Sequence, residues 1–94
     1  MKEEMQKLQD WLNKNHIPYE RIKECQVGID RNQILIEKGE TKLSFICHFG
    51  SYGYEAGLIE MWDYENDPKG WLTAEECKKI IKKALQPLRD KEQL

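Results

Sequence analysis

The sequence lacks a hydrophobic run long enough to cross a membrane. A membrane-spanning helix needs about 18–20 consecutive apolar residues, and no stretch of this chain approaches that length. The first six residues, Met1 to Gln6, are mostly charged or polar and do not contain the apolar core of a signal peptide. We therefore expect a cytoplasmic protein without a membrane partner.

An excess of basic residues is also missing. Fifteen Lys and Arg residues stand against 17 Asp and Glu residues, and the formal net charge is −2 at pH 7. Proteins that bind duplex nucleic acid neutralise phosphates with basic side chains. The charge balance therefore argues against direct duplex nucleic acid binding.

The chain has few of the residues that form disulfide frameworks or metal sites. Its three cysteines, Cys25, Cys47 and Cys77, are an odd set without C-x-x-C spacing. They are therefore interpreted as reduced thiols and not as a disulfide framework or a zinc site. Only two histidines are present, His16 and His48, and they do not cluster in the sequence. We predict no metal and no cofactor.

What the sequence does contain is sufficient for one small folded domain. Of its 94 residues, 39% are hydrophobic, 10% are aromatic and 34% are charged. A chain of this length buries roughly 60–65% of its unfolded surface in a single core. No linker divides the chain, so residues 1–94 are predicted to form one domain.

Apolar spacing predicts a helix at each end of the chain. The first helix should fade at Asn13–His16, because Asn tolerates the left-handed conformation that ends helices. The second begins at a capping box formed by Thr73 and Glu76, and Pro87 should end or bend it. The apolar stripes of these helices are Met1, Met5, Leu8 and Leu12 in the first, and Cys77, Ile80, Ile81, Ala84, Leu85 and Leu88 in the second.

Alternating apolar residues and one short β-branched apolar run, at Gln33–Glu37, predict three or four strands between the helices, joined by short turns. The runs are Cys25–Ile29, Gln33–Glu37, Thr41–Phe49 and Leu58–Trp62, and Asp30–Asn32 is predicted to be a turn. Short turns imply an antiparallel meander. The fold class is therefore α+β, with both helices packed on one face of the sheet.

Three motifs resemble catalytic or ligand sites but do not meet the requirements of those sites. Cys47 and His48 are neighbours on a predicted strand, so their side chains point to opposite faces and cannot form a nucleophile–base pair. Asp63–Asp67 resembles the start of a calcium loop, but Pro68 stands where the loop requires Gly. Gly50–Gly53 lacks the Lys and the helix of a phosphate-binding loop, and is interpreted as a turn.

A surface rich in aromatic and acidic residues is the best candidate site. Between residues 50 and 70 the chain has five acidic residues against Lys69 alone, and exposed Tyr and Trp side chains favour protein contacts. Such a surface is suited to a basic partner. The predicted interaction residues are His48, Ser51, Tyr52, Tyr54, Glu55, Glu60, Trp62 and Asp63.

The run from Ile46 to Met61, with Cys-His-Phe-Gly-Ser-Tyr-Gly and Gly-Leu-Ile-Glu, is followed by Gly-Trp-Leu-Thr-Ala-Glu-Glu at 70–76. This pattern resembles small proteins of Gram-positive bacteria and their phages that have no named activity. The resemblance covers roughly residues 44–85 and transfers no catalytic residue. It implies a phage or prophage accessory protein, a class in which small acidic proteins that block host factors are common.

Three hypotheses of different classes follow. The first, which we favour, is an interaction module that binds a host protein with a basic surface, with inhibition of that protein as one outcome. The second is a small-molecule or nucleotide-like ligand-binding module, in which aromatic rings stack on the ligand and Ser51, His48 or Glu60 bonds to it. The third is an enzyme that uses His48 and Glu60, which requires both side chains in one cleft; we predict no enzyme. An unpaired edge strand would also allow a homodimer.

Overall fold

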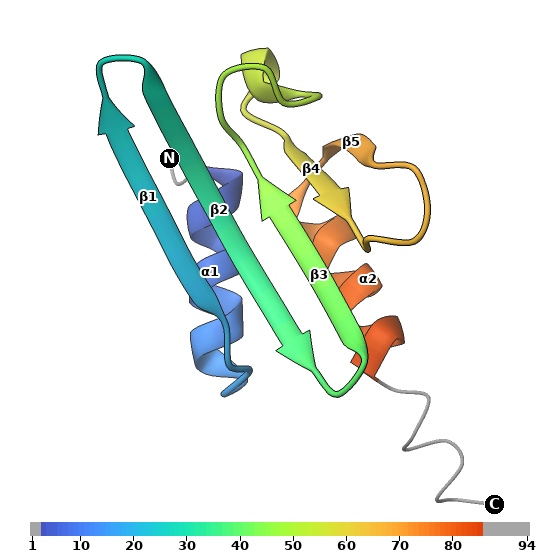
Figure 1. Cartoon of the computed structure of the whole chain (residues 1–94). Coiled ribbons are helices and arrows are strands. Elements are labelled where there is room, and N and C mark those ends of the chain that lie inside the picture. The colour runs from blue at the N-terminus through green and yellow to red at the C-terminus, as the bar shows by residue number, and fades with distance from the viewer. Residues whose placement is uncertain (1–2, 86–94) are drawn as a thin grey trace, which may run out of the picture.

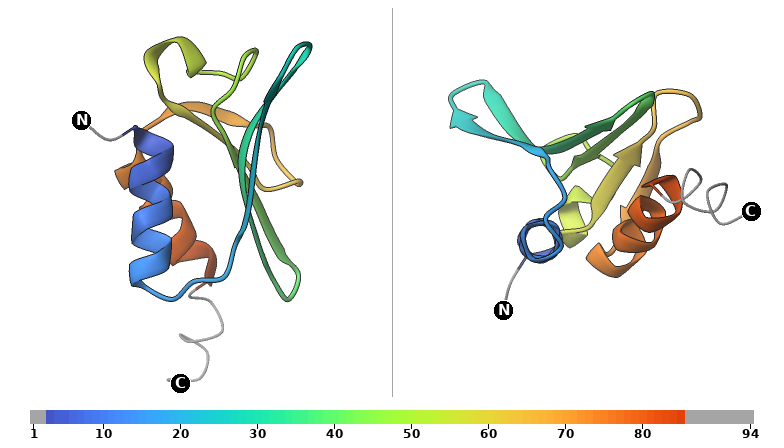
Figure 2. Two further views of the ribbon diagram at one scale, coloured as in Figure 1. Left: turned by 90° about the vertical axis from the view of Figure 1, so that its left-hand side faces the viewer. Right: turned by 90° about the horizontal axis from the view of Figure 1, so that it is seen from below.

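Five antiparallel strands form one sheet in the order β1-β2-β3-β4-β5 (Figure 1). The computed structural model describes residues 3–85. Along the chain the elements are α1 (Glu4–Lys14), β1 (Glu20–Gln26), β2 (Ile29–Lys38), β3 (Thr41–Ile46), the 3₁₀ helix η1 (Tyr54–Ala56), β4 (Ile59–Trp62), β5 (Lys69–Leu72) and α2 (Ala74–Leu85). Both helices lie on the same side of the sheet (Figure 2). The α+β class and the packing of both helices on one sheet face are therefore confirmed.

The core lies between the helices and the sheet. On the sheet side, Phe45 of β3 is opposite both Ile34 of β2 and Met61 of β4. Each of these side chains is at most 5% exposed. Helix α1 contributes Met5, Leu8 and Leu12 to this core, and α2 contributes Ala74, Cys77 and Ile81. Because strand side chains alternate between faces, Glu60 and Trp62 of β4 lie on the sheet face without helices.

The ends of both helices follow the local signals in the sequence. Helix α1 ends at Lys14, within the predicted range, but the left-handed residue is His16 (φ 54°) and not an Asn, since Asn15 has a φ of −98°. At the start of α2, the Thr73 N–H donates to Glu76 Oε1 (3.1 Å) and the Glu76 N–H donates to Thr73 Oγ1 (3.3 Å), so the capping box is confirmed. The predicted roles of Met1, Pro87 and Leu88 lie outside the described residues.

The first hairpin differs from the prediction. Its turn is at Val27–Gly28, and Asp30–Asn32 lie inside β2, where Asp30 pairs with Cys25. The predicted turn at 30–32 is therefore wrong, and the run Cys25–Ile29 belongs to two strands. The physical reason is Gly28, whose φ of +81° meets the left-handed geometry that a tight hairpin turn requires.

The third strand is shorter than predicted. Strand β3 ends at Ile46, and a turn follows in which the Ser51 N–H donates to the His48 carbonyl oxygen (2.9 Å). Phe49 is consequently 80% exposed and not a core residue. Cys47 still packs against the core.

The sheet has five strands and not three or four. The predicted fourth strand, Leu58–Trp62, is present as β4, and β5 is additional. In β5, Leu72 pairs with Ile59 and Lys69 with Met61, with an irregularity between the two pairs. This strand has only four residues, Lys-Gly-Trp-Leu, and its two large apolar residues are adjacent in the chain, so its sequence lacks the apolar alternation by which strands are recognised.

Arg21 of β1 joins α1 to the first hairpin. Its Nε donates to Gln9 Oε1 of α1 (2.8 Å), and its Nη2 donates to Asn32 Oδ1 of β2 (2.6 Å). These contacts set the position of α1 under the sheet, whose two edges are β1 and β5. Within residues 3–85, no helix has the length and apolar character that a membrane span requires.

Candidate functional site

The exposed aromatic residues come from one part of the chain. Six of the seven large hydrophobic side chains that are exposed in the described residues lie between positions 49 and 71, and their exposed fractions run from 37% to 80%. The seventh is Val27, at the tip of the first hairpin. We call the six the aromatic band: Phe49, Tyr52, Tyr54, Trp62, Tyr64 and Trp71.

Tyr52 and Trp71 are held together by the docking of the β3–β4 loop against β5. The Trp71 N–H donates to the Tyr52 carbonyl oxygen (3.2 Å), and the Tyr52 N–H donates to Glu60 Oε1 (2.8 Å). The contact needs glycine at two positions. A Cβ at Gly70 would overlap the Cβ of Tyr52, and a Cβ at Gly53 would lie 2.9 Å from the Trp71 nitrogen.

Trp62 and Tyr64 form a second pair at the other end of β4. Their ring centroids are 4.2 Å apart with the planes inclined by 33°, and the Lys42 Nζ lies 4.7 Å from the Tyr64 centroid. The Trp62 Nε1 donates to the Asn66 carbonyl oxygen (2.8 Å). The indole is therefore fixed by a stacked ring and by a hydrogen bond, although 40% of the residue is exposed.

Asp63 organises the turn that follows β4. Its Oδ1 accepts from the N–H groups of Glu65 (3.0 Å) and Asn66 (2.8 Å), and its Oδ2 accepts from Asn66 Nδ2 (2.9 Å). These hydrogen bonds, with that of the Asn66 N–H first, lower the pKa of Asp63 to about 2. No group of three His, Cys, Asp or Glu side chains in the described chain is arranged to hold a metal ion.

His48 and Ser51 are used by the loop itself. The His48 Nδ1 accepts from the Asn32 N–H (3.2 Å), and the Ser51 Oγ donates to the His48 carbonyl oxygen (2.7 Å) while it accepts from the His48 N–H (3.1 Å). Glu60 bonds to the Tyr52 backbone. Within residues 3–85 no hydrogen bond joins His48 to Glu60, so the structure does not bring these two together as an acid–base pair.

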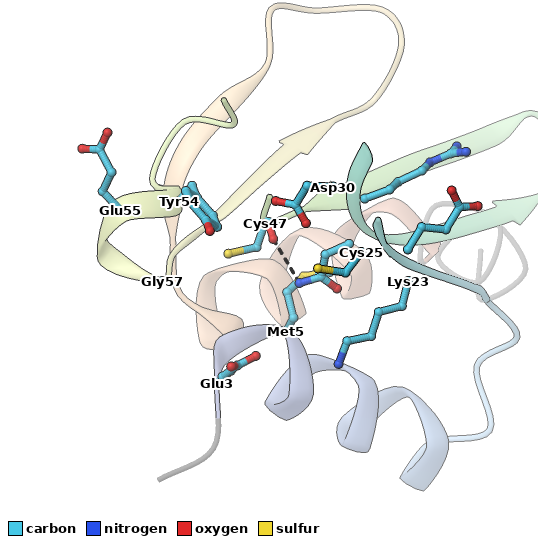
Figure 3. Close-up of a pocket in the computed structure, with 12 residues that line it drawn as sticks. Glu3, Met5, Lys23, Cys25, Asp30, Cys47, Tyr54, Glu55 and Gly57 are labelled. Carbon is cyan, nitrogen blue, oxygen red and sulfur yellow. Dashed lines mark hydrogen bonds between the residues drawn. The ribbon is translucent and has the colours of Figure 1, made fainter. Parts of the chain in front are cut away.

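A hollow of about 490 Å³ opens between the β1–β2 hairpin, the start of α1 and the η1 segment (Figure 3). Met5 and Cys47 contribute apolar surface to it, and Glu3, Asp30 and Tyr54 stand around them. Burial raises the pKa of the Cys47 thiol, and the nearby carboxylates of Glu3 and Asp30 raise it further. The Cys47 thiol therefore lies in the negative field of these two carboxylates, and the basic residues Lys23 and Arg31 also line the hollow.

The eight predicted interaction residues are divided among three places. Tyr54 and Glu55 border the hollow, and the Glu55 carboxylate points away from it (Figure 3). Tyr52 and Glu60 contact each other at the docked β3–β4 loop, and the turn of this loop is formed by His48 and Ser51. Trp62 and Asp63 lie at the other end of β4. Residues at these places that are absent from the prediction are Glu3, Asp30, Phe49, Tyr64 and Trp71.

A sequence signal existed for three of these five, because Tyr64 and Trp71 belong to the same aromatic-rich stretch as Tyr52, Tyr54 and Trp62. Gly50 and Ser51 have turn chemistry, which could have placed Phe49 beyond the end of β3. Glu3 and Asp30 meet only because the hairpin and α1 fold together. Comparison of the chain with protein-family models, with curated proteins and with solved structures gives no match.

Proposed function

We propose that this protein is an interaction module that binds a basic surface of another protein through its aromatic band. The observation that carries the proposal is that exposed aromatic rings and excess acid coincide. Between residues 50 and 70 there are five acidic residues and one basic residue, a local charge of −4, and all six rings lie within or directly next to this segment. Aromatic residues are enriched among the residues that carry binding energy at interfaces.

Part of the aromatic band is also held in place before any partner arrives. Trp62 stacks on Tyr64, and the backbone of Tyr52 is bonded to that of Trp71. Fixing a mobile side chain at an interface costs about 0.5–1.5 kcal/mol. A surface whose rings are already positioned avoids part of this cost, which favours a role in binding.

The acidic residues would act mainly on the rate of association. Opposite charges steer two proteins toward each other, and salt screens this attraction. Binding should therefore become slower as ionic strength rises, with a smaller change in the dissociation rate. The resemblance to phage proteins suggests inhibition of a host factor as the biological result of this binding.

The test has two stages. The full chain is first used to capture proteins from a Gram-positive cell extract, and the captured protein is then purified and titrated against the chain. In the second stage, Tyr52→Ala combined with Trp71→Gly should raise the Kd by at least about tenfold. The exposed Lys79, on the helix side of the molecule, provides the control, because Lys79→Gln should leave the Kd unchanged.

Folding must be checked independently, by circular dichroism of each variant. If the doubly substituted chain is folded and binds the partner as tightly as the original chain, the aromatic band is not the contact surface. The salt dependence gives a second check, since an association rate that does not change between low and physiological salt would contradict the role of the acidic residues.

A further inference from the structure

The β1–β2 hairpin extends beyond the start of α1. Figures 1 and 2 show its tip projecting away from both helices, and Val27 at the tip is fully exposed. The helix-facing side of the hairpin is therefore uncovered there. This is the side that borders the hollow of about 490 Å³, a volume in the range of about 300–1,000 Å³ that is usual for ligand sites.

Two carboxylates from different elements face this hollow. Glu3 precedes α1 and accepts the Lys7 N–H with its backbone carbonyl oxygen (3.0 Å), but its side chain makes no capping bond to the helix. Within residues 3–85 the Glu3 carboxylate has no hydrogen bond or ion pair. Asp30 belongs to β2 and uses Oδ2 to accept from the Phe49 N–H (2.8 Å). Both carboxylates act on the Cys47 thiol, so their fields overlap inside the hollow.

An aromatic ring completes the hollow. Tyr54 lies beside Cys47 and Asp30 in Figure 3, and its ring is supported edge-on by Phe49, with centroids 6.3 Å apart and planes inclined by 78°. A ring beside carboxylates attracts cations through its negative face. A metal ion is a poor fit, because no three ligating side chains converge in the described residues.

Among organic cations, a guanidinium fits this combination best. It is planar, stacks on aromatic rings, is weakly hydrated and bonds to carboxylates with several N–H groups, whereas an ammonium is a compact and strongly hydrated charge. We propose that the hollow binds the guanidinium of an arginine side chain on the partner protein, between Glu3, Asp30 and the ring of Tyr54. The inference rests on the proposed function and adds the chemistry that the partner should present.

The first test is an NMR titration of the full ¹⁵N-labelled chain with three short peptides. They are acetyl-Gly-Arg-Gly-amide and its counterparts with citrulline, which is neutral and has nearly the same shape, and with lysine. Saturable shifts should appear with the arginine peptide at the amides around the hollow, should be weaker with lysine and should be absent with citrulline. Equal binding of the citrulline or the lysine peptide would overturn the assignment.

Variants locate the site. Glu3→Gln and Asp30→Asn should each weaken arginine binding by at least about threefold, and the Asn can still accept from the Phe49 N–H. Glu55→Gln is the matched control, because that carboxylate borders the hollow but points away from it. Lys23 of β1 also lines the hollow, and its positive charge repels a guanidinium. Lys23→Met should therefore strengthen arginine binding by about twofold. Unchanged binding in both Glu3→Gln and Asp30→Asn would refute the site.

The outcomes separate this inference from the proposed function. If the arginine peptide binds in the hollow but the Tyr52→Ala/Trp71→Gly chain still binds the partner fully, the aromatic band is not the contact surface and the arginine site in the hollow is supported. If the Tyr52→Ala/Trp71→Gly chain no longer binds the partner while the arginine peptide produces no saturable shift, the aromatic band is supported as the contact surface and the arginine site in the hollow is refuted. The dispersion of the amide spectrum reports in each case whether the variant is folded.

Discussion

Replacing Gly70 by alanine tests whether the β3–β4 loop is held against β5 as the structure shows. The added methyl group would overlap the Cβ of Tyr52 and lie 2.9 Å from the Tyr52 carbonyl oxygen. That oxygen accepts the hydrogen bond from the Trp71 N–H. Since the φ of Gly70 is not in the left-handed region, alanine suits the backbone there and the whole effect is steric.

The expected cost follows from two ways in which the chain can respond. If the loop stays docked, the methyl group overpacks the contact, which typically costs about 1–3 kcal/mol. If the loop detaches, at least one backbone hydrogen bond is lost, worth about 0.5–1.5 kcal/mol, together with the surface it covers. Either response gives a loss of about 2 kcal/mol. For a domain of this size each kcal/mol lowers Tm by roughly 4–8 °C, so Tm should fall by roughly 8–16 °C.

Thermal unfolding followed by circular dichroism measures the effect. Gly39→Asn is the control: Gly39 has a φ of +61°, which Asn tolerates, and a Cβ there meets nothing within 4 Å. Its Tm should stay within about 2 °C of the original chain. Adding Tyr52→Gly to Gly70→Ala removes the nearest obstructing atom, so the double variant should be more stable than the sum of the two single effects. Equal Tm values for Gly70→Ala and Gly39→Asn would refute the docked loop.

Three further predictions concern strain, protonation and thiol access. Trp71→Gly should be more stable to urea than Trp71→Ala by about 1 kcal/mol, because both remove the indole but only Gly adopts a φ of 60° without strain; the opposite order would contradict that conformation. The pKa of Asp63 is lowered to about 2, so its stabilisation is present above about pH 4 and disappears as the pH falls toward 2. Asp63→Asn should show a smaller loss of Tm over that range. Burial raises the pKa of Cys77 to about 12, so iodoacetamide at pH 8 should label the exposed Cys25 first and Cys77 only on unfolding; mass spectrometry of labelled peptides identifies the order.

The parts of the fold that the sequence predicts are those with local causes. The capping box of Thr73 and Glu76 involves residues three apart, and the helical stripes repeat within one or two turns. Strand β4 alternates between buried and more exposed residues, because only one face of the sheet is covered by helices. These features depend on neighbours in the chain, and the structure retains them.

The parts that the sequence does not predict have causes in distant residues. The turn of the first hairpin was predicted at Asp30–Asn32, whose residues favour turns, but the pairing of Asp30 with Cys25 places the turn at Val27–Gly28. Phe49 continues the apolar alternation of β3, but the turn at His48–Ser51 takes it to the surface. The hollow joins Glu3 to Asp30, which are 27 positions apart in the sequence, so no local pattern reveals it.

The free edge of β1 bears on self-association. A second β1 strand, placed antiparallel against this edge by a two-fold axis normal to the sheet, would set Glu20 against Glu24 and Arg21 against Lys23. A shift to the next allowed register would set Lys23 against its own copy. Like charges directly opposite one another destabilise a strand pair, and charged edges prevent sheets from growing by edge-to-edge pairing. The charge pattern of β1 thus acts against edge-to-edge self-association at high protein concentration, while a strand with complementary charges would meet no such barrier.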